Sequence, residues 1–383
     1  MTIVYFITTV GHGKGGHFHS LNTIANAIGE TDNVHVVNLG VQPSEVLDKT
    51  NYNLSFVNFN GYNFLSVLFR IKKLISQLEP DVIHAFDVHS FAFSRLLSKS
   101  RKQASYLNKC GGPNPKKYFP VSDNLVLFSK ENKAYFDSKE RYYDTKLTLI
   151  PNRVRPVELD SSRIEAFYAK HDKADLSLLR IARIGKHYHK SISQAINLVS
   201  WLKTKGLKVR LIVIGTIQSE TNYNEILEEI KSKNLEDDVI VETSDEFTYN
   251  ASELLDVGDV IIGTGRNFME ASSLNKMLLV PYKDADYPLL VTDANFDAIF
   301  TTNFSPRTQV TDFNEQANLD SIYKALKSKE ERTSKLWFEA YFNVEKGVGL
   351  YKNLYLNQDI PRNSNLIDTF ANILYAIKTF VLK

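Results

Sequence analysis

Short apolar runs alternate with amphipathic stretches along the first 150 residues. Residues 2–10 form a continuous apolar run, which is typical of a strand buried on both faces. In residues 18–28 the apolar side chains recur at helical spacing and share one face. This alternation predicts a doubly wound, parallel α/β sheet. The expected strands are residues 2–10, 33–39, 81–85, 105–109, 125–129 and 147–150, with helices over residues 18–28 and 64–78.

The same pattern begins again after a polar segment with two prolines, residues 151–160. We therefore expect two Rossmann-like domains, residues 1–155 and 156–355, whose strand ends face a cleft. An amphipathic C-terminal helix within residues 356–383 is expected to pack back on the first domain. In the second domain the expected strands are residues 178–184, 209–215, 239–243, 259–263 and 277–281, with helices over residues 191–203, 225–233 and 267–274.

Composition excludes several classes of protein. The 383 residues carry 46 basic and 44 acidic side chains, a near-balance that argues against a nucleic-acid binder. Cys110 is the one cysteine, so the sequence can form no intramolecular disulfide and no cysteine-based metal site. We expect a cytoplasmic protein, because the start has no signal-peptide pattern and no stretch approaches the ~20 apolar residues that span a bilayer.

A glycine-rich loop follows the first expected strand. Gly11, Gly13 and Gly16 satisfy a G-x-G-x-x-G pattern between a strand and a helix. An NAD site would need an acidic residue at the end of the second strand, and that strand ends in Asn38 and Gly40 instead. The missing carboxylate disfavours NAD and leaves two better alternatives: a tight strand–helix turn, or a loop whose backbone N–H groups face a phosphate or sugar.

Histidines and a lysine surround this loop at positions 12, 14, 17 and 19. Imidazoles are common metal ligands, but the spacing lacks acidic partners and is weak evidence for a metal. Donors that face an anionic ligand are the preferred interpretation, and no metal site is predicted.

The third expected strand ends in His84, with Asp87 and His89 close behind. The carboxyl end of a parallel strand is the edge where ligands bind, so Asp87 could orient an acceptor hydroxyl or accept its proton. The alternative is structural: Asp87 caps a helix and His84 is packed in the core. The sequence favours neither.

Two segments of the second domain suit a nucleotide. Arg183 ends a strand and Lys190 opens the next helix, an arrangement suited to a diphosphate, although a solvated basic loop is the alternative. Residues 263–271 form a glycine turn and a helix start in which Arg266 can reach a phosphate or a sugar hydroxyl. Glu270 could accept both ribose hydroxyls, or stabilise the helix dipole instead. The candidate binding residues here are Arg183, Lys190, Gly263, Thr264, Gly265, Arg266 and Glu270.

In order and spacing these segments resemble a GT-B glycosyltransferase, similar to glycosyltransferase family 4 and related bacterial polysaccharide enzymes. The resemblance covers most of the chain and is fairly specific only when its motifs are taken together. They are the Gly15-Gly16 loop, residues 80–84 (PDVIH), 150–154 (IPNRV), the Arg183 and Lys190 pair, residues 213–215 (VIG), 263–271 (GTGRNFMEA) and 303–307 (NFSPR).

The resemblance implies a donor, a nucleotide-diphosphate sugar with a UDP-sugar the first guess, bound mainly by the second domain. Arg183 and Lys190 would bind the diphosphate, and Glu270 the nucleotide ribose. The Gly15-Gly16 loop would close over the donor, and His84 and Asp87 would face the acceptor. Transfer would be retaining and would need neither a metal nor a separate cofactor, because protein cations and a helix N-terminus stabilise the leaving diphosphate.

Two positions depart from the family pattern: Ile262 stands where many members have a first glutamate, and Phe86 where many have a histidine. A non-catalytic partner subunit and a nucleotide-sugar epimerase are the alternatives. The expected acceptor is a saccharide or lipid-linked saccharide in capsule, O-antigen or lipopolysaccharide synthesis at the inner face of the cytoplasmic membrane. Residues 64–78 or 95–102 could make peripheral contact with a membrane. The alternative interpretation is that they are ordinary solvated basic faces.

Overall fold

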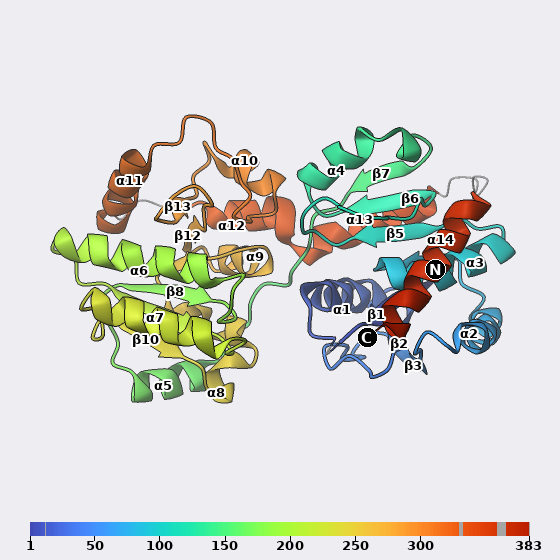
Figure 1. The fold of residues 1–383 in the computed structure, drawn as a ribbon, viewed down its shortest axis with the longest axis horizontal. Coiled ribbons are helices and arrows are strands. Elements are labelled where there is room, and N and C mark those ends of the chain that lie inside the picture. The colour runs from blue at the N-terminus through green and yellow to red at the C-terminus, as the bar shows by residue number, and fades with distance from the viewer. Residues whose placement is uncertain (12, 329–331, 358–364, 383) are drawn as a thin grey trace. The chain divides into compact units, whose positions relative to one another are not determined.

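The computed structural model describes residues 1–11, 13–328, 332–357 and 365–382. The chain divides into two compact units (Figure 1), and each is described by itself. Unit 1 comprises Met1–Val154 and Phe342–Lys383, and unit 2 comprises Arg155–Tyr341. The chain thus returns to unit 1 at residue 342, earlier than the expected residue 356. The reason is that Tyr351 and Tyr355, which precede the expected boundary, are buried in the core of unit 1.

Unit 1 is built on a parallel seven-stranded sheet with the strand order β3-β2-β1-β4-β5-β6-β7. The strands are β1 (Thr2–Thr9), β2 (Asn33–Gly40), β3 (Asn53–Asn58), β4 (Val82–Ala85), β5 (Tyr106–Lys109), β6 (Asn124–Leu127) and β7 (Lys146–Leu149). The helices are α1 (Gly16–Gly29), α2 (Phe64–Leu78), α3 (Val88–Ser100), α4 (Lys130–Asp137), η1 (Glu140–Tyr142), α13 (Val344–Leu356) and α14 (Leu366–Val381).

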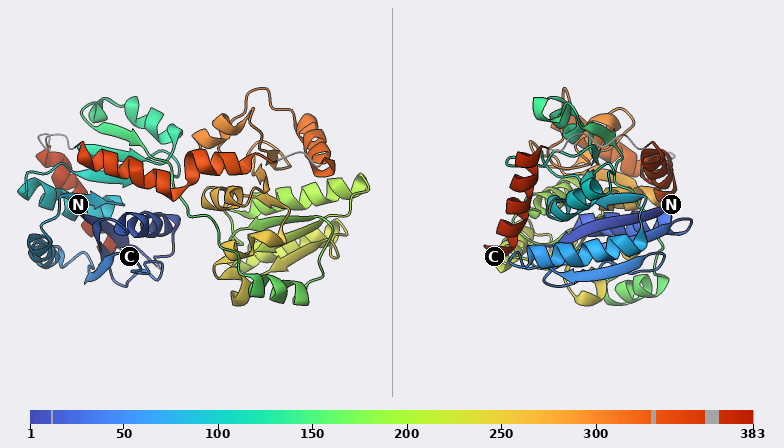
Figure 2. Two further views of the ribbon diagram at one scale, coloured as in Figure 1. Left: turned by 180° about the vertical axis from the view of Figure 1, so that it is seen from behind. Right: turned by 90° about the vertical axis from the view of Figure 1, so that its right-hand side faces the viewer.

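Both faces of this sheet are covered by helices. Because side chains alternate along a strand, Ile3, Tyr5 and Ile7 of β1 enter one core while Val4 and Phe6 enter the other. The first core also contains α1 and α13, which pack against each other (Figures 1 and 2). The second contains α2, α3 and part of α14, and α14 packs on α3. The C-terminal helix therefore packs on the first domain, as the sequence predicts.

Unit 2 repeats the architecture with the strand order β10-β9-β8-β11-β12-β13, in which β13 alone of the named strands is antiparallel to its neighbour. The strands are β8 (Ser177–Ile181), β9 (Arg210–Ile214), β10 (Val239–Glu242), β11 (Val260–Ile262), β12 (Met277–Val280) and β13 (Leu289–Leu290). The helices are α5 (Ser161–Lys170), α6 (His189–Thr204), α7 (Glu220–Ser232), α8 (Asp245–Thr248), η2 (Ala251–Val257), α9 (Arg266–Ser273), α10 (Phe296–Thr301), α11 (Glu315–Lys327) and α12 (Ser334–Trp337), and the π-helical turn η3 (Phe338–Phe342) joins the units.

Candidate functional site

Each sheet has one position where its strand order reverses. In unit 1 the reversal lies between β1 and β4, and in unit 2 between β8 and β11. In open α/β sheets, ligands bind outside the carboxyl ends of the strands at this point, because the flanking loops diverge to opposite faces there. Arg183 follows β8 and the turn Gly263–Gly265 follows β11, so two of the segments predicted from the sequence flank the reversal in unit 2.

The helices that begin beside this reversal have no side-chain caps. α6 begins after Tyr188 and α9 after Gly265, and neither has an N-cap side-chain hydrogen bond or an acidic residue in its first turn. By contrast, α7 and α11 are capped by Ser219 and Asn314 and carry an acid in the first turn. Uncapped N–H groups and the positive end of the helix dipole form a site suited to an anion.

Arg183 is exposed at this edge of unit 2. Its Nη2 donates a hydrogen bond to the Tyr188 hydroxyl over 3.1 Å, and its guanidinium lies 5.4 Å from the centre of the Tyr188 ring. Lys190, also exposed, occupies the second position of α6, and its Nζ donates to the carbonyl of Lys283. Both predicted cations thus lie at the junction of β8 and α6, Arg183 held by an aromatic ring and Lys190 by a backbone carbonyl.

The turn Gly263–Gly265 needs its glycines. A Cβ at Gly263 would lie 2.9 Å from the Cα of Phe268, and Gly265 has a φ of +50°. Within α9, Arg266 Nε donates to Glu270 Oε1 over 2.7 Å, and the Glu270 side chain is only 11% exposed. Arg266 thus engages Oε1 of Glu270 and holds this carboxylate in place within α9.

The loop at residues 303–307, which contains none of the predicted binding residues, packs beside this turn. Asn303 and Phe304 both have a φ of +57°, a strained conformation for residues other than glycine. The Phe304 ring stacks on Phe268 with centroids 3.8 Å apart, and Asn303 Nδ2 lies 3.7 Å from where a Cβ of Gly265 would be. The signal for this loop was present in the NFSPR run at residues 303–307.

At the reversal in unit 1, α1 begins after Gly15 with no side-chain cap and no acid in its first turn. A Cβ at Gly16 would meet nothing within 4 Å, whereas one at Gly15 would lie 3.0 Å from the His17 ring. The start of α1 thus has open space beside it. This open space is compatible with the predicted loop whose backbone approaches a ligand. A tight strand–helix turn alone would not require such space.

Asp87 is the N-cap of α3. Its Oδ1 accepts hydrogen bonds from the backbone N–H groups of His89 and Ser90, and its Oδ2 accepts from that of Thr8 at 2.6 Å. Burial disfavours its charged form, but hydrogen bonds and the nearby histidines outweigh burial and hold the pKa of Asp87 below its usual value. This geometry matches the structural alternative, and a carboxylate with a lowered pKa is a weak base.

His17 and His89 are the residues that join Asp87 at this edge. His89 Nδ1 lies 3.6 Å from Asp87 Oδ1, and its ring stacks on Tyr375 of α14. Burial lowers the pKa of His17, and the charge of Asp87 opposes the shift. The sequence pattern places His17 beside the glycine-rich loop and His89 after the third expected strand. It does not predict that the two lie together, because 72 positions separate them.

His84 is fully buried and belongs to a polar network inside unit 1. Its Nε2 lies 2.8 Å from Asn108 Oδ1, and its Nδ1 lies 2.7 Å from the Tyr355 hydroxyl. The expectation that His84 faces the acceptor as a catalytic residue is therefore corrected: its ring lies in the core, as in the packed alternative, because α13 supplies Tyr355 as a partner. Burial lowers the pKa of His84 to about 3.

A family model described as glycosyl transferase 4-like matches residues 12–112, which include the start of α1 and the strands β2 to β5 of unit 1. A glycosyltransferase from Rickettsia africae has a similar structure, with a TM-score of 0.68 at 16% sequence identity; the likeness covers 92% of this chain and 97% of that one. The likeness of fold over almost the whole of both chains decides the fold assignment. The chain is a GT-B protein that resembles glycosyltransferase family 4.

Two further comparisons agree with the GT-B assignment. The structure of Anabaena HepE in complex with UDP-glucose has a TM-score of 0.65 to this chain at 12% identity. The likeness covers 92% of this chain and 99% of that one. A UDP-N-acetylglucosamine–N-acetylmuramyl-(pentapeptide) pyrophosphoryl-undecaprenol N-acetylglucosamine transferase from Thermodesulfovibrio yellowstonii is 22% identical over 307 residues, 73% of this chain and 79% of that protein. The family match and the fold together support the glycosyltransferase class of enzyme.

Two hollows in the GT-B protein lie away from the strand reversals. One in unit 1, of about 1070 Å³, is lined by Ser105 and Asp123, which directly precede β5 and β6. One in unit 2, of about 340 Å³, is lined by Lys276 and Met277 at the start of β12. Both lie at the amino edges of their sheets, where ligands of this fold are not expected.

Among the residues that the structure describes, no group of three or more His, Cys, Asp or Glu side chains is arranged to hold a metal ion. His12, one of the histidines around the glycine-rich loop, lies outside the described residues. No helix in the described ranges is both long and apolar enough to cross a bilayer.

Proposed function

We propose that this GT-B protein transfers a glycosyl group from a nucleotide-diphosphate sugar, in the first instance a UDP-sugar, to a hydroxyl of a saccharide or lipid-linked saccharide. The pathway we propose is assembly of a bacterial surface polysaccharide. The observation that carries the proposal is the pair of uncapped helix starts, α6 and α9, that flank the strand reversal of unit 2 beside Arg183. The relative that uses UDP-N-acetylglucosamine and the neighbour solved with UDP-glucose support uridine as the base.

In this proposal the protein's own cations stabilise the leaving group. Charge accumulates on the diphosphate as the bond to the sugar breaks, and Arg183, Lys190 and the N–H groups of α6 and α9 offset that charge without a metal. Glu270, which Arg266 holds in place, accepts the ribose hydroxyls. Ile262 is fully buried, so the turn that follows it, rather than a side chain at 262, would contact the donor sugar. We propose retention of anomeric configuration.

We place the acceptor at the carboxyl edge of unit 1, beside the open start of α1 at Gly15 and Gly16. Asp87 contributes there by fixing Thr8 and the first turn of α3, which positions His89. Phe86 is buried in the core of unit 1, so it does not replace the histidine that many family members carry at that position.

The purified chain, incubated with UDP-glucose, UDP-galactose, UDP-N-acetylglucosamine and GDP-mannose, is expected to release free nucleotide from one donor. Release should accelerate when a matching saccharide acceptor is added, because transfer to a hydroxyl then replaces slow hydrolysis. Chromatography of nucleotides and sugars measures both rates. A changed sugar nucleotide formed without any acceptor would identify an epimerase instead, and binding of a donor without turnover would identify a non-catalytic subunit.

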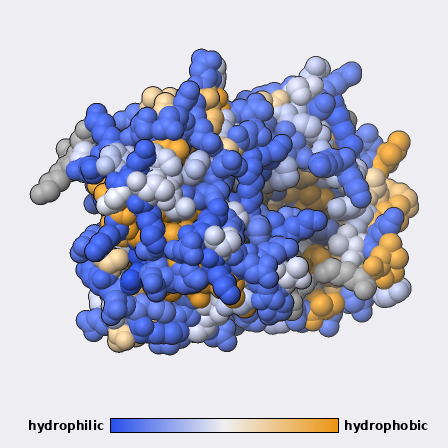
Figure 3. Space-filling model, turned by 60° about the vertical axis from the view of Figure 1, so that its left-hand side comes forward, coloured by the Kyte–Doolittle hydropathy of each residue, from blue (hydrophilic) through white to orange (hydrophobic). Residues whose placement is uncertain are grey.

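We further propose that unit 1 contacts the inner face of an anionic membrane through α14. Asp368 fixes this helix by accepting from Arg95 over 2.7 Å and from Arg141. Elsewhere on α14, Ile367 is 81% and Phe370 63% exposed. Figure 3 shows hydrophobic residues gathered at the right-hand edge of the molecule. α2 adds exposed apolar and basic side chains, which suit an anionic lipid surface: Leu65, Phe69, Arg70, Lys72 and Lys73.

Vesicles that contain phosphatidylglycerol are expected to sediment the protein, and vesicles of phosphatidylcholine alone should not. Replacing Ile367 and Phe370 by serine should weaken binding about tenfold or more, because each apolar side chain contributes about 1.5–3 kcal/mol when buried in lipid. Leu227→Ser, at an exposed position of α7 in unit 2, is the matched control and should bind normally. Equal sedimentation of the double variant and the wild type would exclude α14 as the contact.

A further inference from the structure

Arg180 is a charged residue inside the central strand of unit 2. It belongs to β8, where its neighbours along the strand, Leu179 and Ile181, are apolar, and only 1% of it is exposed. Its Nη1 donates to the carbonyl of Ile262 over 2.9 Å, and its Nη2 donates to Ser191 Oγ over 3.0 Å. The guanidinium therefore links β8 to the end of β11 and to the first turn of α6.

Among the residues that the structure describes, no acidic partner balances this buried charge. In the described parts of the chain, Arg180 forms no ion pair with a carboxylate, and its buried Nε has no hydrogen-bond partner. Burial lowers the pKa of Arg180 to about 10. Buried charges in proteins are ordinarily paired, because an uncompensated one costs several kcal/mol after relaxation. A buried arginine without an acid therefore requires an explanation.

The two groups that Arg180 holds are the groups next to the candidate anion site. Ile262 directly precedes the turn Gly263–Gly265, and Ser191 directly follows Lys190. Ser191 Oγ in turn donates to the carbonyl of Tyr188, the residue whose hydroxyl accepts from Arg183. The buried guanidinium of Arg180 thus holds the segments on both sides of the strand reversal, the end of β11 and the first turn of α6.

The surroundings of this guanidinium are themselves positive. The uncapped starts of α6 and α9 direct the positive ends of their dipoles to the same edge, and Arg183 lies at the junction above. Several sources of positive potential at one place raise the free energy of the empty protein, and together they attract an anion. The missing negative charge is therefore expected to come from a ligand.

We propose that Arg180 is a positioning residue whose buried charge is balanced by the diphosphate of the bound donor. It holds the turn at 263–265 and the start of α6 in register and adds to the positive potential at the reversal, without touching the ligand. This inference rests on the proposed function, because that function supplies the diphosphate.

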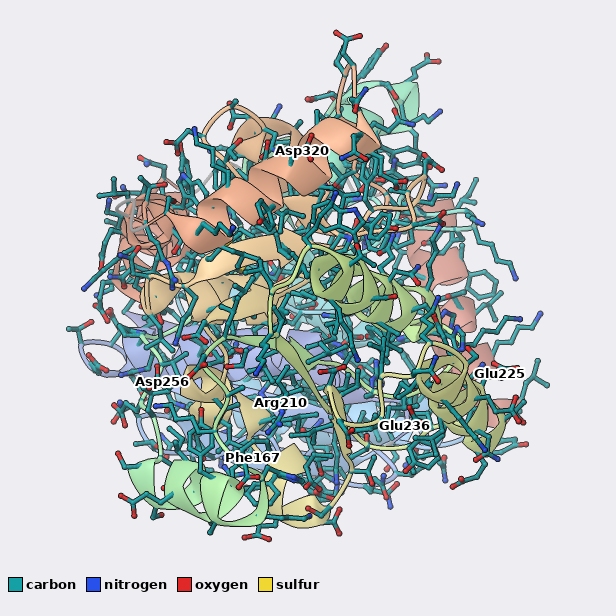
Figure 4. The ribbon with its side chains drawn as sticks, turned by 90° about the vertical axis from the view of Figure 1, so that its left-hand side faces the viewer. Phe167, Arg210, Glu225, Glu236, Asp256 and Asp320 are labelled. Carbon is teal, nitrogen blue, oxygen red and sulfur yellow. The ribbon has the colours of Figure 1, made fainter. Side chains whose placement is uncertain are left out.

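The test compares UDP with UMP by isothermal titration calorimetry on the full chain. Arg180→Gln keeps a donor for the Ile262 carbonyl but removes the charge, and is expected to weaken UDP binding about tenfold and UMP binding less, since Coulomb attraction scales with ligand charge. Arg180→Lys keeps the charge and should retain most of the UDP affinity. Arg210→Gln is the matched control and should bind UDP normally, because Arg210 (labelled in Figure 4) begins β9 and so lies at the amino edge of the sheet, away from the strand reversal.

Stability separates this role from a purely structural one. With no ligand present, urea unfolding of Arg180→Gln is expected to need at least as much denaturant as the wild type, because an uncompensated buried charge has been removed. Unchanged UDP affinity in Arg180→Gln would overturn the inference, and so would a variant that is unfolded or markedly less stable. Failure of the wild type itself to bind UDP, GDP or their sugar conjugates would refute the proposed function instead.

Discussion

Replacing Arg183 by alanine is expected to lower the rate of sugar transfer by about 10²–10³-fold, the usual effect of removing one charged donor from a developing anion. Arg183 is exposed just after β8 and contacts Tyr188 through a 3.1 Å hydrogen bond and the face of its ring, so its loss should not destabilise the fold. The affinity for UDP should fall as well, because the same guanidinium binds the diphosphate before and during transfer. Steady-state kinetics with the active donor measures both effects.

Lys186 provides the matched control for this substitution. It is an exposed cation of the same loop, so Lys186→Ala changes the net charge equally but leaves Arg183, Tyr188 and the start of α6 intact. Its rate should remain within about threefold of the wild type, as expected when the local field is screened by salt. A normal rate for Arg183→Ala, or equal losses for the two variants, would contradict the assignment of Arg183.

Acidification is expected to destabilise unit 1 through His84. The folded-state pKa of about 3 lies below the ordinary value of 6.5, so the unfolded chain binds the proton first as the pH falls. The stability that neutral His84 contributes is present above pH 6.5 and is lost between pH 6.5 and 3. At pH 5 the free energy of unfolding of unit 1 should have fallen by about 2 kcal/mol from this residue alone.

The network around His84 explains why the ring stays neutral. Asn108 Nδ2 donates to Tyr351, so Asn108 Oδ1 accepts from His84 Nε2–H, and His84 Nδ1 accepts from the Tyr355 hydroxyl, which lies 3.0 Å from the Tyr5 hydroxyl. Each member is partnered by the neutral tautomer, and a second ring proton would face the Tyr355 donor. Protonation would therefore break the network as well as bury a charge.

Hydrogen exchange of β1 and β4 amides at pH 7.5 and pH 5 measures this effect. His84→Gln should be less stable than the wild type at pH 7.5 but should lose about 2 kcal/mol less on acidification, since the titrating group is gone. Trp201 and Trp337 both lie in unit 2, so their fluorescence follows that unit as an internal control. An identical acid response in the two proteins would show that His84 does not titrate in the expected range.

The sequence predicted most of the fold because the fold follows from local patterns. Every strand expected from an apolar run is present, and α2 has the predicted bounds, residues 64–78. β3 was not predicted because its sequence, NLSFVN, contains polar residues and no apolar run. It is an edge strand with one buried side chain. The two-residue strand β13 was too short to leave a pattern.

The candidate site was predictable only in part. Arg183 and the glycine turn were found because they directly follow apolar strands. The pair formed by Arg266 and Glu270 could have been predicted from its four-residue spacing. His84 could not be placed, since its partner Tyr355 lies 271 positions away. Arg180 was overlooked because a charge within an apolar run gives no local sign of whether it is buried or exposed.

Hydrogen exchange with and without UDP tests the central claim most directly, because it locates the bound nucleotide without any substitution. The account predicts that UDP slows exchange in two segments that meet only in the folded chain, residues 182–192 and 262–270. Protection confined to the hollow lined by Lys276 and Met277 at the amino edge of unit 2, or protection nowhere, would contradict it.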